Sequence, residues 1–255
     1  MKVYFVGAGP GDPDLITKKG EKLLNTADTV VYTGSLINPK VLDFTSSSCE
    51  LYDSSGLTKE ELIDIMLKAV ENDKLVVRLH TGDPGLYGAI QEQIDVLQEK
   101  GITTDIVPGI SAYQGAMATL KRELTLPGIT QTVILTRLAK KTPVPEKERL
   151  RYLASHQSTI CIYLSTHILR EVISELIEGG MSIDTPVTVV YKATWPEEQV
   201  ISGTLNDIND KVIESGIKKT ALIIVGEVLT SDSYTDSYLY RSDFTHGYRV
   251  GDSNE

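Results

Sequence analysis

The sequence contains few of the residues that build metal centres or disulfide frameworks. Its 255 residues include two cysteines, Cys49 and Cys161, and four histidines. The cysteines lie far apart in the chain, and none of these residues stands at the spacing typical of metal ligands. We therefore expect two reduced thiols, no metal ion held by the protein, and a cytoplasmic location.

Long apolar runs and clusters of positive charge are also lacking. The first apolar run ends at Gly7, too early for the core of a signal peptide, and no run approaches the roughly 18 apolar residues of a membrane span. With 35 acidic and 25 basic residues, the net charge is −10. This charge repels nucleic acid and acidic membranes, so we expect neither as a partner. An anionic small molecule would need a local gathering of positive charge.

What the sequence does have is a regular alternation of strand-like and helix-like segments. Apolar runs bounded by turn residues alternate with amphipathic stretches in the first half of the chain, which predicts a mostly parallel sheet. The expected strands are 3–6, 29–32, 75–79 and 105–107, and the expected helices are 15–26, 59–72, 86–99 and 111–120.

The pattern changes at the charged segment KRELTLPGIT, residues 121–130. Two expected strands then flank Trp195 with no room for a helix between them, so the second sheet should be mixed. Its expected strands are 132–135, 159–164, 187–191, 199–202 and 221–225, with helices at 145–155, 168–178 and 205–215. We predict an α/β protein with one α/β domain at 1–118, another at 119–229, and a partly docked tyrosine-rich tail at 230–255.

Four loops rich in glycine, proline, serine or aspartate follow the expected parallel strands. Ligands of parallel α/β sheets bind beyond the carboxyl ends of the strands, and glycine lets the backbone approach a ligand closely. One such loop is usually only a turn, but four on one rim indicate a binding site. The loops read GAGPGDPD (7–14), TGSLINP (33–39), HTGDPGLYG (80–88) and PGISAYQG (108–115).

The first loop looks like a dinucleotide-binding turn but fails that test. The G-x-G-x-x-G fingerprint would place its third glycine at Asp12, and Pro10 lacks the amide proton that a pyrophosphate needs. A nicotinamide-dependent dehydrogenase is therefore disfavoured. The sequence also contains no P-loop and no G-x-S-x-G nucleophile motif. Other interpretations stay open: Asp83 either contacts a ligand or caps the next helix, Ser111 either lines the site or is an N-cap, and His80 could line the site.

Several longer segments carry a family resemblance. They are VYFVGAGPGDPDLITKKGEKLLNTADTVVYTGSL, VVRLHTGDPGLYGAIQEQ, VPGISA, RELTLPGITQTVILTR, TPVPE, TPVTVVYKATWPEE and FTHGYR. Together, over about residues 2–249, they resemble the tetrapyrrole (corrin/porphyrin) methylases, and QTVILTR, TPVPE and YKATWP are similar to the branch that methylates C-11 of the macrocycle. A sister methylase acting at another position, or on uroporphyrinogen III or precorrin-2, is the alternative.

The resemblance implies an S-adenosylmethionine-dependent C-methyltransferase of cobalamin biosynthesis. It also implies two α/β domains with the active-site cleft between them, and a homodimer. The residues that match the family's cofactor-binding positions are Pro10, Thr81, Gly82, Asp83, Ser111, Ala112, Leu164 and Ala193. Many relatives carry threonine in place of Ser111, which keeps the hydroxyl. No catalytic base can be named.

A tetrapyrrole with many carboxylates requires positive charge near the cleft. Arg137 directly follows an expected strand, and its guanidinium suits a carboxylate. We expect Gly9 and Gly11 to give the macrocycle room and Arg137 and Lys192 to bind it. Further basic candidates are Arg122, Lys140 and Lys141. The sequence leaves open whether the substrate already carries cobalt.

Overall fold

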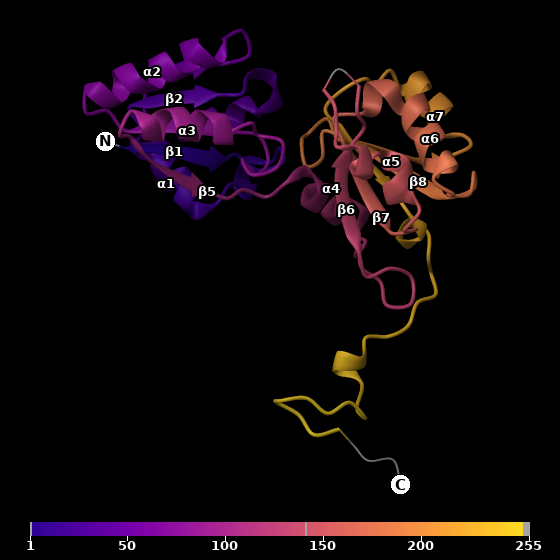
Figure 1. Cartoon of the computed structure of the whole chain (residues 1–255). Coiled ribbons are helices and arrows are strands. Elements are labelled where there is room, and N and C mark those ends of the chain that lie inside the picture. The colour runs from indigo at the N-terminus through magenta and orange to yellow at the C-terminus, as the bar shows by residue number, and fades with distance from the viewer. Residues whose placement is uncertain (1, 141, 252–255) are drawn as a thin grey trace. The chain divides into compact units, whose positions relative to one another are not determined.

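The computed structural model describes residues 2–140 and 142–251, and the chain forms two compact units (Figure 1). The first unit contains Met1–Thr119 together with Lys192–Gln199, and the second contains Leu120–Tyr191 and Val200–Glu255. The segment Lys192–Gln199 thus groups with the first unit, although it lies within the stretch 119–229 that the sequence assigns to the second domain.

The first unit has an all-parallel sheet, as expected, with strand order β3-β2-β4-β1-β5 within the described residues. Its strands are β1 (Lys2–Gly7), β2 (Thr29–Tyr32), β3 (Glu50–Asp53), β4 (Val76–His80) and β5 (Thr103–Val107). The crossover helices are α1 (Lys18–Thr26), α2 (Lys59–Glu71) and α3 (Gln91–Glu99), whereas α4 (Ala112–Leu120) follows β5, the last strand of this sheet along the chain. Parallel strands need such crossovers, and the helices cover both faces of the sheet.

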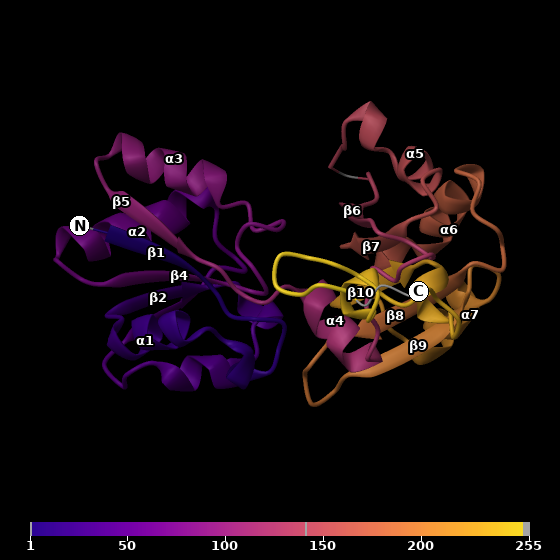
Figure 2. The ribbon, with the colours of Figure 1, turned by 90° about the horizontal axis from the view of Figure 1, so that it is seen from below.

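Alternate residues of β1 pack into two cores on opposite sides of this sheet. Val3 and Phe5 join the cluster formed with α2 and α3, whereas Val6 joins the cluster that contains Leu24 of α1. Figure 2 shows α2 and α3 on one face and α1 on the other. The two-residue period of the strand therefore fixes which helix covers which face.

The first unit differs most from expectation at two elements. Strand β3 was not expected, because its four residues are all exposed and form no apolar run. The helix expected at 86–99 begins only at Gln91, because Tyr87 and Ala89 adopt positive φ values of 56° and 49°, which a helix cannot contain. The residues before Gln91 are therefore loop.

The second unit contains a mixed sheet with strand order β6-β7-β10-β8-β9. Strands β6 and β7 are parallel, and β10 runs antiparallel to both β7 and β8. The hydroxyls of Thr188 and Ser202 pair, and the amide of Leu205 donates to the carbonyl of Thr185, which is an antiparallel register for β8 and β9. The strands are β6 (Val133–Arg137), β7 (Thr159–Tyr163), β8 (Pro186–Tyr191), β9 (Gln199–Thr204) and β10 (Ala221–Val225).

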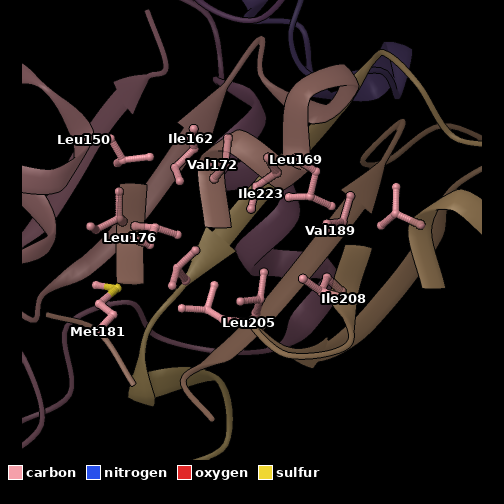
Figure 3. Packing of buried hydrophobic residues seen from close by; sticks show 14 of the residues in the cluster. Leu150, Ile162, Leu169, Val172, Leu176, Met181, Val189, Leu205, Ile208 and Ile223 are labelled. Atoms are coloured by element: carbon pink, nitrogen blue, oxygen red, sulfur yellow. The ribbon is translucent and has the colours of Figure 1, made fainter. Parts of the chain in front are cut away.

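The core of the second unit lies between its sheet and the helices α5 (Leu150–Ala154), α6 (Leu169–Glu178) and α7 (Ile208–Ser215). Leu176 of α6 and Ile223 of β10 are fully buried there, as the side chains in Figure 3 illustrate. The helix expected at 145–155 is shorter, because 3-10 geometry at Glu146–Glu148 precedes α5.

The tail is ordered largely by its own residues. The amide of Thr235 donates to the carbonyl of Pro127, and the guanidinium of Arg249 donates to the carbonyls of Leu239, Arg241 and Phe244. Several of its tyrosine side chains remain exposed. Other 3-10 turns of the chain are Pro13–Leu15, Gly34–Leu36, Pro39–Phe44, Thr166–Ile168, Glu227–Leu229 and Tyr238–Tyr240.

Within residues 2–140 and 142–251, no helix combines the length and apolar character needed to cross a membrane.

Candidate functional site

The loops after β1, β4 and β5 meet at one edge of the first sheet. Strand β1 lies between the other two, and the register pairs Gly7 with His80 and Val6 with Val107, so all three strands end at the same level. Beyond them, the amide of Gly82 donates to the carbonyl of Gly9 at 2.8 Å, and the reverse bond measures 3.3 Å. The loops after β1 and β4 thus extend the hydrogen bonding between these strands into the candidate site.

Three glycines allow the loop backbones to touch. A Cβ atom at Gly109 would lie 2.2 Å from the carbonyl oxygen of Gly82, and one at Gly7 would lie 2.5 Å from the same oxygen. Both distances are far below van der Waals contact, and the obstructing atoms belong to backbone. Only glycine fits at these two positions, so the close approach of the three loops depends on these glycines.

Asp83 ties the second of these loops to the third. One carboxylate oxygen accepts from the amide of Gly85 at 2.8 Å, and the other accepts from the amide of Gly109 at 2.9 Å. Helix α3 begins only at Gln91, so Asp83 caps a tight turn instead of the following helix. Its carboxylate positions the backbone around which Thr81 and Gly82 are arranged.

Ser111 and Ala112 stand at the start of α4, next to this turn. Ser111 is 3% exposed, and its carbonyl accepts from the amides of Gln114 and Gly115 in the first turn. A Cβ atom on Gly82 would lie 3.6 Å from the Cα of Ser111. The expected cofactor-contacting residues of the loops after β4 and β5 are therefore neighbours.

The segment Lys192–Gln199, called here the Trp195 hairpin, packs against the first loop. The indole Nε1 of Trp195 donates to the carbonyl of Pro10 at 3.0 Å, and the amide of Asp12 donates to Oγ1 of Thr194 at 2.9 Å. The hairpin also carries Ala193, which is 6% exposed. Sequence reasoning missed Thr194 and Trp195, although the latter is the single tryptophan of the chain.

Seven of the eight expected cofactor residues thus lie in the first unit, on the loops or the hairpin just described: Pro10, Thr81, Gly82, Asp83, Ser111, Ala112 and Ala193. The eighth, Leu164, directly follows β7 in the second unit. Its φ is +54° and its apolar side chain is 64% exposed. The left-handed backbone of this leucine is strained, and strain of this kind is found at functional sites.

The expected substrate-binding cations already have local partners. Arg137, at the end of β6, donates to the carbonyls of Thr142 and Pro143 at 3.1 and 2.8 Å. Lys192 has a φ of +46°, and its ammonium group lies 3.3 Å from Glu197 and 4.6 Å from the centre of the Trp195 ring. Both cations are therefore held in place by their own segments.

The other basic candidates are surface ion-pair partners in the second unit. Arg122 donates to the carbonyl of Ser231 and lies 3.5 Å from Asp232, and Lys140 pairs with Glu171 at 3.0 Å. Lys141 lies outside the described residues.

A buried arginine holds the far end of the loop after β4. Arg78 is 4% exposed, and it donates to the carbonyl of Val31 and to Oε1 of Gln93. The side-chain Nε2 of Gln93 in turn donates to the carbonyl of Ala89 at 2.9 Å. Burial lowers the pKa of Arg78 to about 10. A buried charge requires hydrogen-bonded neighbours, and this one uses them to order the strained end of the loop.

His80, at the end of β4, is buried beneath the same loop. It is 2% exposed and stacks on Phe5 with ring centroids 6.0 Å apart. Within the described residues its Nε2 has no hydrogen-bond partner. Burial, and secondarily the charge of Arg78, lower the pKa of His80 to about 3. The imidazole is therefore neutral at neutral pH, and its ring packs against Phe5 of β1.

His80 should make the protein acid-sensitive. Because its pKa is about 3 in the folded chain and near 6.5 when unfolded, the unfolded chain binds the extra proton in that window, and stability falls as the pH falls. From pH 6.5 to pH 5, the wild type should lose about 2 kcal/mol more free energy of unfolding than His80→Leu, at ~1.4 kcal/mol per pH unit. Urea unfolding at both pH values measures this. Exposed His156→Leu is the control, and parallel pH profiles for wild type and His80→Leu would contradict the expectation.

No group of histidine, cysteine, aspartate and glutamate side chains in the described part of the chain could hold a metal ion. Cys49 and Cys161 are free thiols, and burial raises the pKa of Cys161 to about 12.

The sequence matches one protein family over most of its length. The family model of the tetrapyrrole (corrin/porphyrin) methylases matches residues 2–209. A Methanocaldococcus jannaschii protein named cobalt-precorrin-4 C(11)-methyltransferase is 55% identical over 97% of this chain and 96% of its own. A Pseudomonas aeruginosa protein named precorrin-4 C(11)-methyltransferase is 44% identical over 99% of this chain and 100% of its own.

Two solved structures of tetrapyrrole methyltransferases are also similar to this chain. The X-ray structure of a cobalamin biosynthetic enzyme, cobalt-precorrin-4 methyltransferase, superposes with a TM-score of 0.88 and 46% identity, covering 90% of this chain and 96% of that one. Uroporphyrin-III C-methyltransferase from Thermus thermophilus, solved with S-adenosylhomocysteine, has a TM-score of 0.76 and 26% identity, covering 92% of this chain and 98% of that one.

Proposed function

Because the chain belongs to the tetrapyrrole (corrin/porphyrin) methylase family, we propose that it methylates C-11 of cobalt-precorrin-4 to give cobalt-precorrin-5 in cobalamin biosynthesis. The observation that carries this proposal is the 55% identity to a cobalt-precorrin-4 C(11)-methyltransferase over 97% of the chain. The sister activity on uroporphyrinogen III is less well supported, because the solved relative with that name is 26% identical.

The methyl donor we propose is S-adenosylmethionine, which supplies an activated methyl group on a sulfonium. The loops of the first unit fit such a ligand: they are rich in glycine, their backbones approach one another closely, and their small side chains leave room for a flat group. Asp83 holds this surface in shape through two backbone amides. Because the donor is already activated, the task of the protein is to position donor and acceptor for in-line transfer.

Some assignments rest on the family resemblance with support from local geometry. We propose that Pro10, Thr81, Gly82, Asp83, Ser111, Ala112, Leu164 and Ala193 contact the donor, and that Gly9, Gly11, Arg137 and Lys192 contact the tetrapyrrole. The strained, exposed Leu164 supports the first group. The fixed positions of Arg137 and Lys192 support the second, because a held cation loses less entropy on binding a carboxylate.

We also propose that the enzyme is a cytoplasmic homodimer. Both properties are those expected of the family, and the two free thiols are compatible with a reducing compartment.

A methylation assay tests the proposal. The purified protein is incubated with S-adenosylmethionine and, in separate reactions, with cobalt-precorrin-4, precorrin-4 or uroporphyrinogen III. We expect one added methyl group on cobalt-precorrin-4, located at C-11 by carbon NMR with a labelled methyl donor. The relative named precorrin-4 C(11)-methyltransferase makes metal-free precorrin-4 the second candidate substrate. Methylation of uroporphyrinogen III alone, or binding of NADH with no binding of S-adenosylhomocysteine, would refute the proposal.

A further inference from the structure

We propose that the Trp195 hairpin positions the Gly9–Asp12 loop for ligand binding, with Trp195 and Glu198 as its positioning residues. This inference rests on the proposed function, because the binding of a ligand at this loop is part of that proposal. In this loop, the carbonyl of Pro10 and the amide of Asp12 are both bonded by side chains of the hairpin.

The backbone of the Gly9–Asp12 loop is held by side chains from elsewhere in the first unit. The carbonyl of Pro10 accepts from Trp195, and the amide of Asp12 donates to Thr194. The carbonyl of Gly11 accepts from Nδ2 of the buried Asn38 at 2.9 Å. Pro10 has no amide proton to contribute. Two of these three tethers come from the hairpin, so its removal would leave the Pro10 carbonyl and the Asp12 amide without these partners.

The contact between the loop and the indole is too close for any larger residue. A Cβ atom at Gly11 would lie 1.9 Å from Cδ1 of Trp195. On the other side, a Cβ atom at Gly115 of α4 would lie 2.9 Å from Pro10 and 3.2 Å from Thr194. The loop is therefore enclosed between the hairpin and the helix that carries Ala112.

Glu198 holds the hairpin in this position. Its Oε2 accepts from the amide of Thr194 at 2.6 Å and from the hydroxyl of Thr119 at 2.7 Å, which joins the hairpin to the end of α4. Thr194 has a φ of +69°, a conformation that threonine adopts only when its surroundings enforce it. Glu198 supplies that constraint, and Thr194 then presents its hydroxyl to Asp12.

The single tryptophan makes the arrangement measurable without any ligand. Acrylamide quenching of its fluorescence reports how far the indole is exposed. We expect increased quenching in Gly11→Ala, because the new methyl group displaces the ring, and in Glu198→Ala, because the hairpin loses its tether. Glu197→Ala removes the neighbouring carboxylate, which pairs with Lys192 and, within the described residues, bonds neither Thr194 nor Thr119, and should leave the quenching unchanged.

Binding of S-adenosylhomocysteine, measured by calorimetry, provides the second readout. Glu198→Ala should weaken binding by about tenfold, and Trp195→Phe, which keeps a ring but loses the bond to Pro10, by about fivefold. Glu198→Gln should bind within about twofold of wild type, because an amide oxygen in the place of Oε2 can still accept from both the Thr194 amide and the Thr119 hydroxyl. This rescue separates positioning from a need for charge, and thermal unfolding confirms that each variant is folded.

The two readouts must change together. If Glu198→Ala alters neither quenching nor binding relative to Glu197→Ala, or alters only one of them, the proposal is overturned. If the wild-type chain itself fails to bind S-adenosylhomocysteine, the proposed function fails. The quenching of Gly11→Ala and Glu198→Ala then still decides whether the hairpin holds the loop.

Discussion

Replacing Gly109 by alanine should abolish methyl transfer and lower the free energy of unfolding by about 3 kcal/mol or more, the range of severe overpacking. The added methyl group would lie 2.2 Å from the carbonyl oxygen of Gly82 and 2.8 Å from the Cα of Gly7. Both obstacles are backbone atoms of loops that are bonded to each other, so no side chain can rotate to make room. The loops after β4 and β5 must separate, which breaks the bond between Asp83 and the amide of Gly109.

Urea unfolding and calorimetric binding of S-adenosylhomocysteine check this expectation. Gly56→Ala is the matched control, because a Cβ atom there meets nothing within 4 Å, and it should leave both stability and binding close to wild type. If Gly109→Ala unfolds and binds like Gly56→Ala, the close approach of the three loops does not describe the protein in solution.

The elements that could be predicted from sequence are those with strong local patterns. Strands β1 and β4 are short apolar runs bounded by turn residues, and α2 has an apolar stripe and a capping box formed by Thr58 and Glu61. Strand β3 has no such pattern, because it lies at the exposed edge of the sheet, where its backbone pairs with that of β2. The late start of α3 was missed because Tyr87 and Ala89 give no local signal for left-handed geometry.

In the candidate site, too, contacts that follow from a local pattern could be predicted and long-range contacts could not. That Gly9 and Gly82 meet could be anticipated, because strands that pair in parallel carry their loops to one edge. The contact between Pro10 and Trp195 joins residues 185 positions apart, and no periodicity or motif spacing encodes it. Tertiary contacts of this kind come only from the fold, which explains why Trp195 and Glu198 were absent from the expected site.

Asp83→Ala should weaken binding of S-adenosylhomocysteine by more than about tenfold and cost about 2–3 kcal/mol of stability, the range for hydrogen bonds to a charged group. The carboxylate accepts two backbone amides, from Gly85 and Gly109, and alanine leaves both without that acceptor. The variant should remain folded, because the sheet and its two cores do not involve Asp83.

Asp83→Asn separates two roles of this carboxylate: stabilising the turn through backbone amides, and contacting the ligand through its charge. An asparagine side chain can accept one of the two amides through its oxygen, but its NH₂ group faces the other amide as a donor against a donor. We therefore expect intermediate stability and intermediate affinity, measured by urea unfolding and calorimetry. If asparagine restores stability but affinity stays as low as in Asp83→Ala, the charge itself contacts the ligand. If both variants bind like wild type, Asp83 neither shapes the site nor contacts the methyl donor, and the assignment of the loop after β4 is wrong.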